Sequence, residues 1–294
     1  MHVFPFSHEH SLTDQAFVNC CRDCERSYHL VSERLRDFHT QLSGYSQQEL
    51  RQLSQQDIYQ LYLILDDIAH LECGSHLAER ILASAEIQEI LPDIRWYYNT
   101  FFEVHETYLV HEVLAADDPW QPLQFFGLYP RYETLIRTQM EQLDLPRPQK
   151  LVFIGCGPMP LSLILLNRLY GISSIGLDID PKAVSLARQC LERLELDQEI
   201  SILQGTEEML AALDWDVVVV AALAEPKRKI FASLYRIMKA SQKRPVICRT
   251  YSGLLTLLHP PLREEDYMGF RVHQEIRPEN NRVNNTLLQL EMNG

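Results

Sequence analysis

The chain has 294 residues, of which 46% are hydrophobic, and its formal net charge at pH 7 is −13. This apolar content is enough for a substantial core, and the negative charge repels phosphate backbones, so nucleic acid is not expected as a partner. No apolar run approaches the ~20 residues that a membrane helix needs, and the first residues lack the features of a signal peptide. We therefore expect a cytoplasmic protein of one large or two ordinary domains, with no membrane partner.

Seven cysteines are spread through the chain without the spacing of a small disulfide-rich domain. In a cytoplasmic protein we expect them to be reduced thiols. Cys20, Cys21 and Cys24 are close enough in sequence to suggest metal ligands, but no second pair follows at the distance of a zinc finger, and a predicted helix runs through them. We therefore predict ordinary thiols there, and no metal site.

The first 122 residues have apolar side chains at helical spacing and almost no strand signal. Helices are predicted over residues 17–35, 50–71, 76–90 and 93–115. Ser46 followed by Glu49 is a capping-box pattern, which marks the start of the second helix. The last helix mixes Glu103, His105 and Glu106 with tyrosines and phenylalanines, and these aromatic residues favour a position docked over a sheet. This region is therefore predicted to form an all-helical domain that acts as a lid and binds substrate.

The pattern changes from residue 123 onward. After a further helix that ends near residue 143 and a stiff linker containing prolines, short β-branched runs alternate with helical segments, which is typical of βαβ units and a parallel sheet. Strands are predicted over residues 151–154, 174–177, 200–203, 217–221 and 246–249. Two further strands, 270–276 and 285–291, are predicted to form an antiparallel hairpin that closes the sheet. Residues 123–294 are thus predicted to form an α/β domain.

The first predicted strand ends in a glycine turn made of Gly155, Cys156, Gly157 and Pro158. Glycine permits a tight turn and a close backbone approach to a ligand, and the helix that follows offers free N–H groups. Pro160 stands where a dinucleotide fingerprint has its third glycine, which weakens the case for NAD. The short sheet and the terminal hairpin favour S-adenosylmethionine instead.

The second predicted strand ends at Asp178, which lies 23 residues after Gly155. An acidic residue at that place can accept hydrogen bonds from both ribose hydroxyls of a nucleotide. Asp180 followed by a proline is an N-cap pattern, so its predicted role is structural. Thr206 follows the third strand, where an adenine ring would be flanked. The combination of strand, glycine turn, helix and acid resembles the Rossmann-like domain of class I S-adenosylmethionine-dependent transferases.

The glycine turn continues as a proline-x-proline pattern, and this pattern resembles the nicotianamine synthases. The resemblance covers roughly residues 93–292. It is also carried by the segments 129–132, 178–181, 219–223, 249–252 and 283–284. It implies that the donor is contacted by Ile179, Ala221, Ala222 and Leu223 as well.

Members of that family transfer the 3-amino-3-carboxypropyl (aminobutyrate) group of S-adenosylmethionine, rather than its methyl group, to an amine. All three carbons on the sulfonium are electrophilic, so the orientation of the acceptor decides which of them reacts. The attacking amine must be neutral, so the site needs a proton acceptor. The resemblance therefore implies an enzyme that uses S-adenosylmethionine as co-substrate and releases 5′-methylthioadenosine.

Two departures from the family bear on the acceptor. In an ungapped comparison, His105 and Arg131 stand where the nicotianamine synthases carry a glutamate and a tyrosine at the acceptor site. These departures resemble more closely the bacterial relatives that make opine metallophores and add one aminobutyrate unit to histidine. The resemblance then implies histidine as the substrate and an NADPH-dependent opine dehydrogenase as the downstream partner.

Several side chains are candidates for the acceptor site, each with a structural alternative. His105 could accept the amine proton or be a half-buried helix histidine, and Glu103 and Glu106 are the alternative bases or ordinary exposed glutamates. Arg131 could clamp a substrate carboxylate through its planar fork or form a surface salt bridge. Tyr132 could hydrogen-bond the substrate or pack in the core.

Arg249 ends a predicted strand on the side where open α/β sheets bind ligands. A buried arginine needs an anion, and a substrate carboxylate would serve. Tyr251 lies two residues further on, in the same segment that resembles the family, and is predicted to contact the substrate. Three other functions stay open: a nicotianamine synthase that transfers three units, a small-molecule N-methyltransferase, and a non-catalytic regulator that binds S-adenosylmethionine. The oligomeric state also stays open, with a homodimer as one option.

Overall fold

The computed structural model describes residues 22–71, 73–145, 147–278 and 282–293, so Cys20 and Cys21 lie outside the described residues. The chain divides into two compact units. One unit comprises Met1–Val104 and Ser252–Pro260, and the other comprises His105–Tyr251 and Pro261–Gly294. The sequence predicted a single boundary after residue 122. The division lies earlier in the chain, inside a continuous helix, and a short segment of the C-terminal half joins the helical unit.

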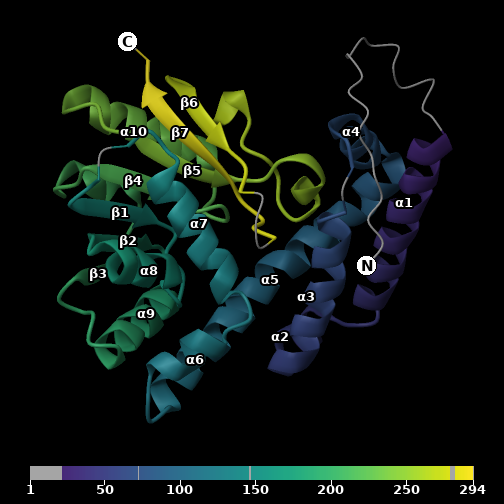
Figure 1. The fold of residues 1–294 in the computed structure, drawn as a ribbon, viewed down its shortest axis with the longest axis horizontal. Helices are drawn as coiled ribbons and strands as arrows, with labels where there is room; N and C mark the ends of the chain where they lie inside the picture. The colour runs from purple at the N-terminus through teal and green to yellow at the C-terminus, as the bar shows by residue number, and fades with distance from the viewer. Residues whose placement is uncertain (1–21, 72, 146, 279–281, 294) are drawn as a thin grey trace. The chain divides into compact units, whose positions relative to one another are not determined.

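The first unit is helical (Figure 1). Its elements are α1 (Arg22–Leu42), α2 (Gln47–Arg51), α3 (Gln55–Ala69), α4 (Ser75–Ala83), the first part of α5 (Ala85–Ala115) and the 3₁₀ helix η2 (Gly253–Leu257). The predicted capping box of Ser46 and Glu49 is confirmed at the start of α2. The predicted break near residue 91 is wrong, because Pro92 lies inside α5 and the break falls at Ser84 instead. A proline removes one helical hydrogen bond, yet the helix continues through Pro92, and the flanking Leu91 is buried.

The aromatic residues in the first part of α5, up to Phe102, pack inside the helical unit. The ring of Phe101 stacks on Tyr62 of α3 with a centroid separation of 4.1 Å, and Tyr97 packs against Phe38 of α1 at 5.6 Å. The hydroxyl of Tyr97 donates a hydrogen bond to the carbonyl oxygen of Ile58 at 2.7 Å. These contacts lie within the helical unit, whereas His105–Ala115 of the same helix belong to the unit that contains the sheet. Docking of the helix over the sheet therefore stays a prediction. The periodic pattern indicates that a face is apolar, but it does not identify the partner of that face.

The second unit contains a seven-stranded sheet with the order β3-β2-β1-β4-β5-β7-β6 (Figure 1). The strands are β1 (Lys150–Ile154), β2 (Ser173–Asp178), β3 (Ile200–Gln204), β4 (Val217–Val220), β5 (Val246–Thr250), β6 (Phe270–Ile276) and β7 (Thr286–Met292). The pairs among β1 to β5 are parallel, and β7 pairs antiparallel with both β5 and β6. The predicted strands, their parallel arrangement and the closing antiparallel pair are thus confirmed.

Helices accompany the strands of this unit in the expected alternation. They are the end of α5, α6 (Trp120–Phe125), α7 (Tyr129–Glu141), α8 (Leu161–Tyr170), α9 (Pro181–Arg193), α10 (Lys227–Ala240) and the 3₁₀ helices η1 (Glu207–Ala211) and η3 (Glu264–Asp266). Valines of β1 and β4 form one core cluster with Phe231 and Leu234 of α10. The predicted N-cap is confirmed, because Asp180 Oδ1 accepts a hydrogen bond from the Lys182 N–H at 3.0 Å. Because the central strands are parallel, their carboxyl ends meet at one edge of the sheet, where ligands bind in open α/β folds.

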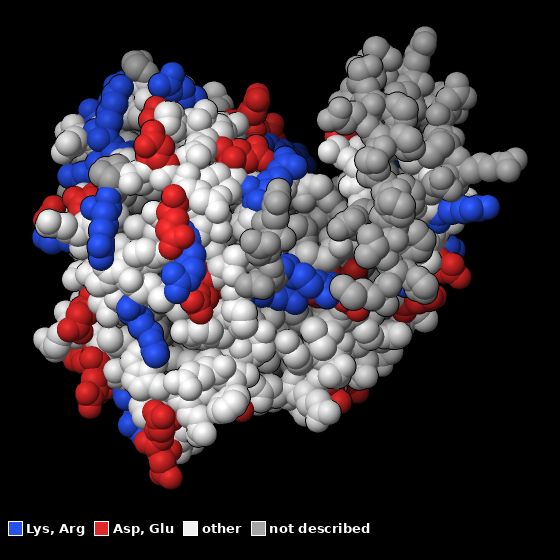
Figure 2. Space-filling view, in the orientation of Figure 1, with Lys and Arg blue, Asp and Glu red and all other residues white. Residues whose placement is uncertain are grey.

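Charged side chains of both signs are interspersed over the face of the molecule shown in Figure 2. They pair locally on the surface, as between Arg271 of β6 and Glu291 of β7, whose atoms lie 3.1 Å apart. Such exposed pairs stabilise a fold only weakly. Within the described ranges, no helix has the length and apolar character needed to cross a membrane.

Candidate active site

The two glycines of the turn after β1 have no room for a side chain. Gly155 and Gly157 have φ angles of +80° and +68°, in the left-handed region that favours glycine. A Cβ atom on Gly155 would lie 2.8 Å from the Cβ of Ala224, and one on Gly157 would lie 2.9 Å from Oε2 of Glu106. The turn therefore lies directly between the loop after β4 and a carboxyl group of α5.

Asp178 at the end of β2 holds this turn in place. The N–H of Gly155 donates to the carbonyl oxygen of Leu177 at 2.8 Å, and the N–H of Gly157 donates to Asp178 Oδ2 at 2.8 Å. The other carboxylate oxygen, Oδ1, accepts from the N–H of Asp180 at 3.0 Å. An ionised carboxylate has about four acceptor positions, so two remain for the hydroxyl groups of a ligand.

Three other residues predicted to bind a nucleotide lie in the turn itself or just after the ends of β2 and β3. Cys156 is buried, and burial raises the pKa of its thiol, so it has no use as a nucleophile. Ile179 follows Asp178 and leaves 67% of its surface exposed, which suits a flat apolar ligand group. Thr206 accepts from the N–H of Glu208 at 3.4 Å and caps η1, so it already has a structural task.

The loop after β4 supplies the last predicted contacts of this kind. The N–H of Ala221 donates to the carbonyl oxygen of Ile154 at 3.0 Å, which continues the pairing of β4 with β1 into the glycine turn. Ala222 is buried, whereas Ala221 and Leu223 are half-buried, as is Pro158 in the turn. The structure therefore brings this loop and the glycine turn together.

Glu106 and Tyr132 form a hydrogen-bonded pair beside the glycine turn. The hydroxyl of Tyr132, in the first turn of α7, donates to Glu106 Oε1 at 3.1 Å. Burial raises the pKa of Glu106 to about 8; the bond from Tyr132 opposes this shift, and the charge of Asp178 adds to it. Burial also raises the pKa of Tyr132 well above its ordinary value, so the phenol stays protonated and donates. Glu106 can therefore exchange a proton near neutral pH, as an acid–base group must.

The neighbours of Glu106 on α5 have different surroundings. His105 is buried, with its ring 5.1 Å from that of Phe126, and burial lowers its pKa to about 4, so the imidazole is neutral at pH 7. Glu103 is exposed and forms an ion pair with Arg51 at 2.6 Å. Adjacent helical residues point about 100° apart, so His105 and Glu106 face different surroundings. Of the three predicted bases, the structure places Glu106 at the glycine turn.

Arg249, at the carboxyl end of β5, is a buried cation with neutral partners. It leaves 4% of its surface exposed and donates from Nη1 to Ser162 Oγ at 2.8 Å and from Nη2 to Gln139 Oε1 at 3.2 Å. Its guanidinium also lies 5.0 Å from the ring centroid of Phe153. Burial lowers its pKa to about 10, so it keeps its charge at neutral pH. In the part of the chain that the structure describes, no carboxylate forms an ion pair with it, so its charge is free to hold an anion.

The remaining predicted substrate contacts lie near this cation or on α7. Tyr251 lies two residues after Arg249 and is buried. The electrostatic interaction between the phenol groups of Tyr251 and Tyr132 raises the pKa of Tyr132. Arg131 is half-buried in the first turn of α7. Sequence reasoning missed Gln139 and Ser162, the acceptors for Arg249, because no local pattern indicates which side chains meet a distant arginine.

The cysteines that the structure describes, namely Cys24, Cys73, Cys156, Cys190 and Cys248, form no disulfide bonds with one another. Cys24 lies 3.3 Å from His76 Nε2. Across the described ranges, no group of three or more His, Cys, Asp or Glu side chains is arranged to hold a metal ion.

The sheet order, with the glycine turn after β1, an acid at the end of β2 and β7 antiparallel to its neighbours, defines the class I, Rossmann-like fold of S-adenosylmethionine-dependent transferases. A sequence model described as nicotianamine synthase protein matches residues 24–292. The chain belongs to the nicotianamine synthase family.

Similar proteins fall into two groups by name. Nicotianamine synthase 2 of Arabidopsis thaliana is 29% identical over 191 residues, which is 60% of this chain and 59% of that protein. The L-histidine 2-aminobutanoyltransferase of Pseudomonas aeruginosa is 28% identical over 142 residues, which is 48% of this chain and 53% of that protein. The matched regions thus span little more than half of these curated relatives.

Solved structures of MtNAS match over nearly the whole length. The crystal structure of MtNAS in complex with MTA and tNA has a TM-score of 0.81 and 30% identity, and it covers 94% of this chain and 100% of that one. A glutamate-to-glutamine mutant of MtNAS in complex with S-adenosylmethionine also has a TM-score of 0.81, over 90% of this chain and 98% of that one.

Proposed function

We propose that this protein transfers the aminobutyrate group of S-adenosylmethionine to the amine of histidine and releases 5′-methylthioadenosine. The observation that carries the proposal is the Glu106 carboxyl group, which lies beside the glycine turn, is bonded to Tyr132, and has its pKa raised to about 8. An attacking amine must lose a proton, and a base whose pKa is close to that of an α-amino group, about 7.7–8.0, is suited to accept it.

The residues of the sheet edge fit S-adenosylmethionine. When bound, this co-substrate would supply an electrophilic carbon on its sulfonium. The turn at Gly155 and Gly157 permits a close backbone approach, and Asp178 keeps acceptor positions for ribose hydroxyls. Ile179 offers an exposed apolar side chain for the adenine ring.

In the proposed mechanism, the protein orients the acceptor and removes its proton. Arg249 would hold a substrate carboxylate, because its own partners are neutral. Glu106 would accept the amine proton, while the Tyr132 hydroxyl keeps the carboxyl group oriented. Positioning the amine in line with one of the three sulfonium carbons would select aminobutyrate transfer over methyl transfer.

Histidine as the acceptor is supported by the names of bacterial relatives. L-histidine 2-aminobutanoyltransferases of Pseudomonas aeruginosa and Yersinia pestis are 28% and 23% identical to this chain over 142 and 158 residues. An opine dehydrogenase downstream, cytoplasmic location and a lid formed by residues 1–122 remain predictions that accompany this proposal.

One observation favours nicotianamine synthesis as a second candidate function. The ungapped comparison placed His105 and Arg131 at the family's glutamate and tyrosine, but the structure pairs the next residue in each segment, Glu106 with Tyr132. The spacing of 26 residues is the same for both pairs. We therefore assign the family's glutamate and tyrosine to Glu106 and Tyr132, and this assignment removes the sequence argument against a nicotianamine-type acceptor.

A product assay tests the proposal and separates the candidates. The protein is incubated with S-adenosylmethionine and L-histidine, D-histidine or no added amino acid, and the products are identified by mass spectrometry. 5′-Methylthioadenosine with a histidine carrying one aminobutyrate unit is expected. Three linked units formed without histidine would establish the second candidate instead. S-adenosylhomocysteine would indicate methyl transfer, and tight donor binding without turnover would indicate a regulator, so either result contradicts the proposal.

Replacing Asp178 with alanine is expected to weaken S-adenosylmethionine binding by about 1–3 kcal/mol, the cost of leaving a buried hydrogen-bonding group without its partner. The variant loses acceptors for the ribose and also the bond that holds the N–H of Gly157. Calorimetric titration measures the affinity. Asp180→Ala is the matched control, because it removes only the cap of α9. This variant should lose about 0.5–2 kcal/mol of stability while its affinity for S-adenosylmethionine stays unchanged. Unchanged affinity in Asp178→Ala would exclude the ribose role.

The pH dependence of the reaction should reflect the raised pKa of Glu106. Only the ionised carboxylate accepts a proton, so kcat/KM should rise with pH by about tenfold per pH unit up to the pKa of the base. The plateau should begin near pH 8, the raised pKa of Glu106. The rates of the wild type and of Glu106→Gln are measured from about pH 5.5 to about pH 9.5. Steps of ~0.5 pH unit are fine enough to resolve a single ionisation. A profile with the same shape in both proteins would assign the ionisation to the substrate amine alone.

A further inference from the structure

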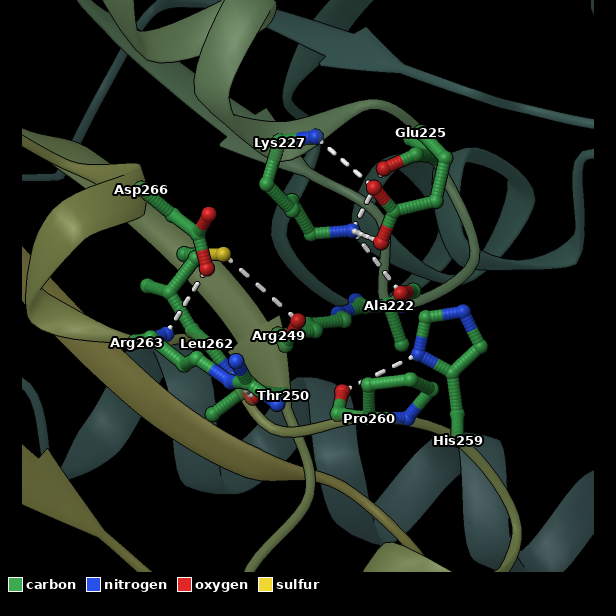
Figure 3. Close-up of polar contacts among 12 residues, drawn as sticks. Ala222, Glu225, Lys227, Arg249, Thr250, His259, Pro260, Leu262, Arg263 and Asp266 are labelled. Carbon is green, nitrogen blue, oxygen red and sulfur yellow. Dashed lines mark hydrogen bonds and ion pairs between the residues drawn. The ribbon is translucent and has the colours of Figure 1, made fainter. Parts of the chain in front are cut away.

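Lys227 is a buried lysine at the start of α10, immediately after the loop that follows β4. It leaves 6% of its surface exposed, and its ammonium group donates to the carbonyl oxygens of Ala222 at 2.9 Å and Ala224 at 2.5 Å. Oε1 of Glu225 lies 3.5 Å from the same nitrogen. Figure 3 shows the lysine side chain reaching back toward Ala222 and Glu225.

These contacts account for the bonding capacity of the ammonium group, which has three N–H donors. Two donors meet backbone carbonyls, and the third direction is taken by a carboxylate. The second oxygen of Glu225 accepts from the backbone N–H of Lys227 at 2.8 Å, so Glu225 contacts both ends of the residue. Residues 222–225 are thereby wrapped around one buried charge, with two carbonyl groups turned toward it.

The same loop forms a wall of the glycine turn. A Cβ atom on Gly155 would lie 2.8 Å from the Cβ of Ala224 and 3.3 Å from that of Ala221. The loop and the turn are therefore in direct contact. A shift of the loop by a few tenths of an ångström would change the space beside Gly155. The loop carbonyls that could otherwise turn toward a ligand are held by Lys227.

We infer that Lys227 is a positioning residue for the donor half of the site: its ammonium group holds residues 221–224 against Gly155 and so shapes the surface that receives S-adenosylmethionine. This inference rests on the proposed function, because it takes S-adenosylmethionine as the ligand of the glycine turn. Lys227 acts through the loop and contacts no substrate in this role. Its loss should therefore weaken donor binding and leave acceptor recognition, which depends on other residues, unchanged.

The test uses Lys227→Met, which keeps most of the apolar stem and removes the charge and all three donors. Lys229→Met is the matched control, because Lys229 lies on the same helix with an exposed side chain. For each protein, the Kd of S-adenosylmethionine is measured by calorimetry, the KM of the acceptor by the product assay, and the Tm without ligand. We expect the Kd for the donor to rise about tenfold or more in Lys227→Met, the scale of lost charge-assisted hydrogen bonds. The acceptor KM should stay within about twofold, and Lys229→Met should resemble the wild type.

The outcomes separate this inference from the proposed function. A folded Lys227→Met protein that binds the donor as tightly as the wild type overturns the inference and leaves the function intact. Equal losses for donor and acceptor also overturn it, because they indicate general loosening of the fold. If the wild type itself binds no S-adenosylmethionine, the proposed function fails first.

A second variant decides the matter if Lys227→Met does not fold. Lys227→Arg keeps the charge but spreads its donors over three nitrogens of a planar group, none of them at the distance of Nζ from the backbone, so this variant is expected to lose the present contacts with the two carbonyls. A selective loss of donor affinity in this variant supports the inference, whereas wild-type affinity for the donor contradicts it.

Discussion

Replacing Glu106 with glutamine is expected to lower kcat/KM for aminobutyrate transfer by about 10²–10⁴-fold, the range that a general base contributes. The amide keeps an oxygen that accepts from the Tyr132 hydroxyl and has nearly the same size, so the pair and the glycine turn should stay in place. It cannot accept a proton from the substrate. Initial rates of 5′-methylthioadenosine release measure the loss, and calorimetry should give an S-adenosylmethionine Kd close to that of the wild type.

Glu103→Gln is the matched control for this prediction. Glu103 lies three residues earlier on the same helix, and its exposed carboxylate pairs with Arg51 at 2.6 Å. An exposed ion pair contributes about 0–1 kcal/mol, so the control should keep nearly full activity and stability. The comparison isolates the position of the carboxyl group from the general effect of removing one negative charge from α5.

The result would contradict the proposed base if Glu106→Gln kept activity within about tenfold of the wild type. In that case the proton would have to leave by another route. His105 is the neighbouring candidate, because burial lowers its pKa to about 4 and leaves a neutral imidazole at pH 7. A large loss in His105→Gln together with a small loss in Glu106→Gln would move the role to the histidine.

The sheet and the glycine turn were predictable because their signals are local. A strand of a buried parallel sheet is a continuous β-branched run, as in residues 217–220, and the strand partner hardly alters that pattern. The turn at Gly155 and Gly157 requires positive φ angles, which only glycine adopts freely. The cap at Asp180 depends on its own neighbours in sequence. Each of these features is determined within a few residues.

The acceptor side was less predictable because its contacts are long-range. Sequence alone offered three bases on one helix and had no means of choosing among them, since the choice depends on which face of α5 meets the glycine turn. The partners of Arg249 lie 87 and 110 residues away in sequence, at Ser162 and Gln139. Lys227 lies close in sequence to the carbonyls it holds, but a lysine in the first turn of a helix is usually exposed. Its burial depends on the path of the preceding loop.

Arg249→Met is expected to raise the KM of the acceptor about 10–100-fold, because a hydrogen bond to a charged group contributes roughly 1.5–3 kcal/mol. In the folded protein the guanidinium charge meets only neutral partners, and the Nε donor of Arg249 and the Nε2 donor of Gln139 have no hydrogen-bond partner among the described residues. A carboxylate would satisfy both the charge and these donors. The prediction follows from the cost of leaving a buried cation without an anion.

The stability of the same variant distinguishes a binding role from a structural one. Removal of an uncompensated buried charge favours the folded state, whereas loss of the bonds to Ser162 and Gln139 disfavours it, so the Tm without ligand should change little. The increase in Tm that the wild type gains from saturating acceptor should be lost. Arg244→Met is the control, because Arg244 precedes β5 and stacks on Trp215 at 4.5 Å, at the opposite end of the strand from Arg249. A lowered Tm with an unchanged acceptor KM in Arg249→Met would make Arg249 a structural cation that serves the fold alone.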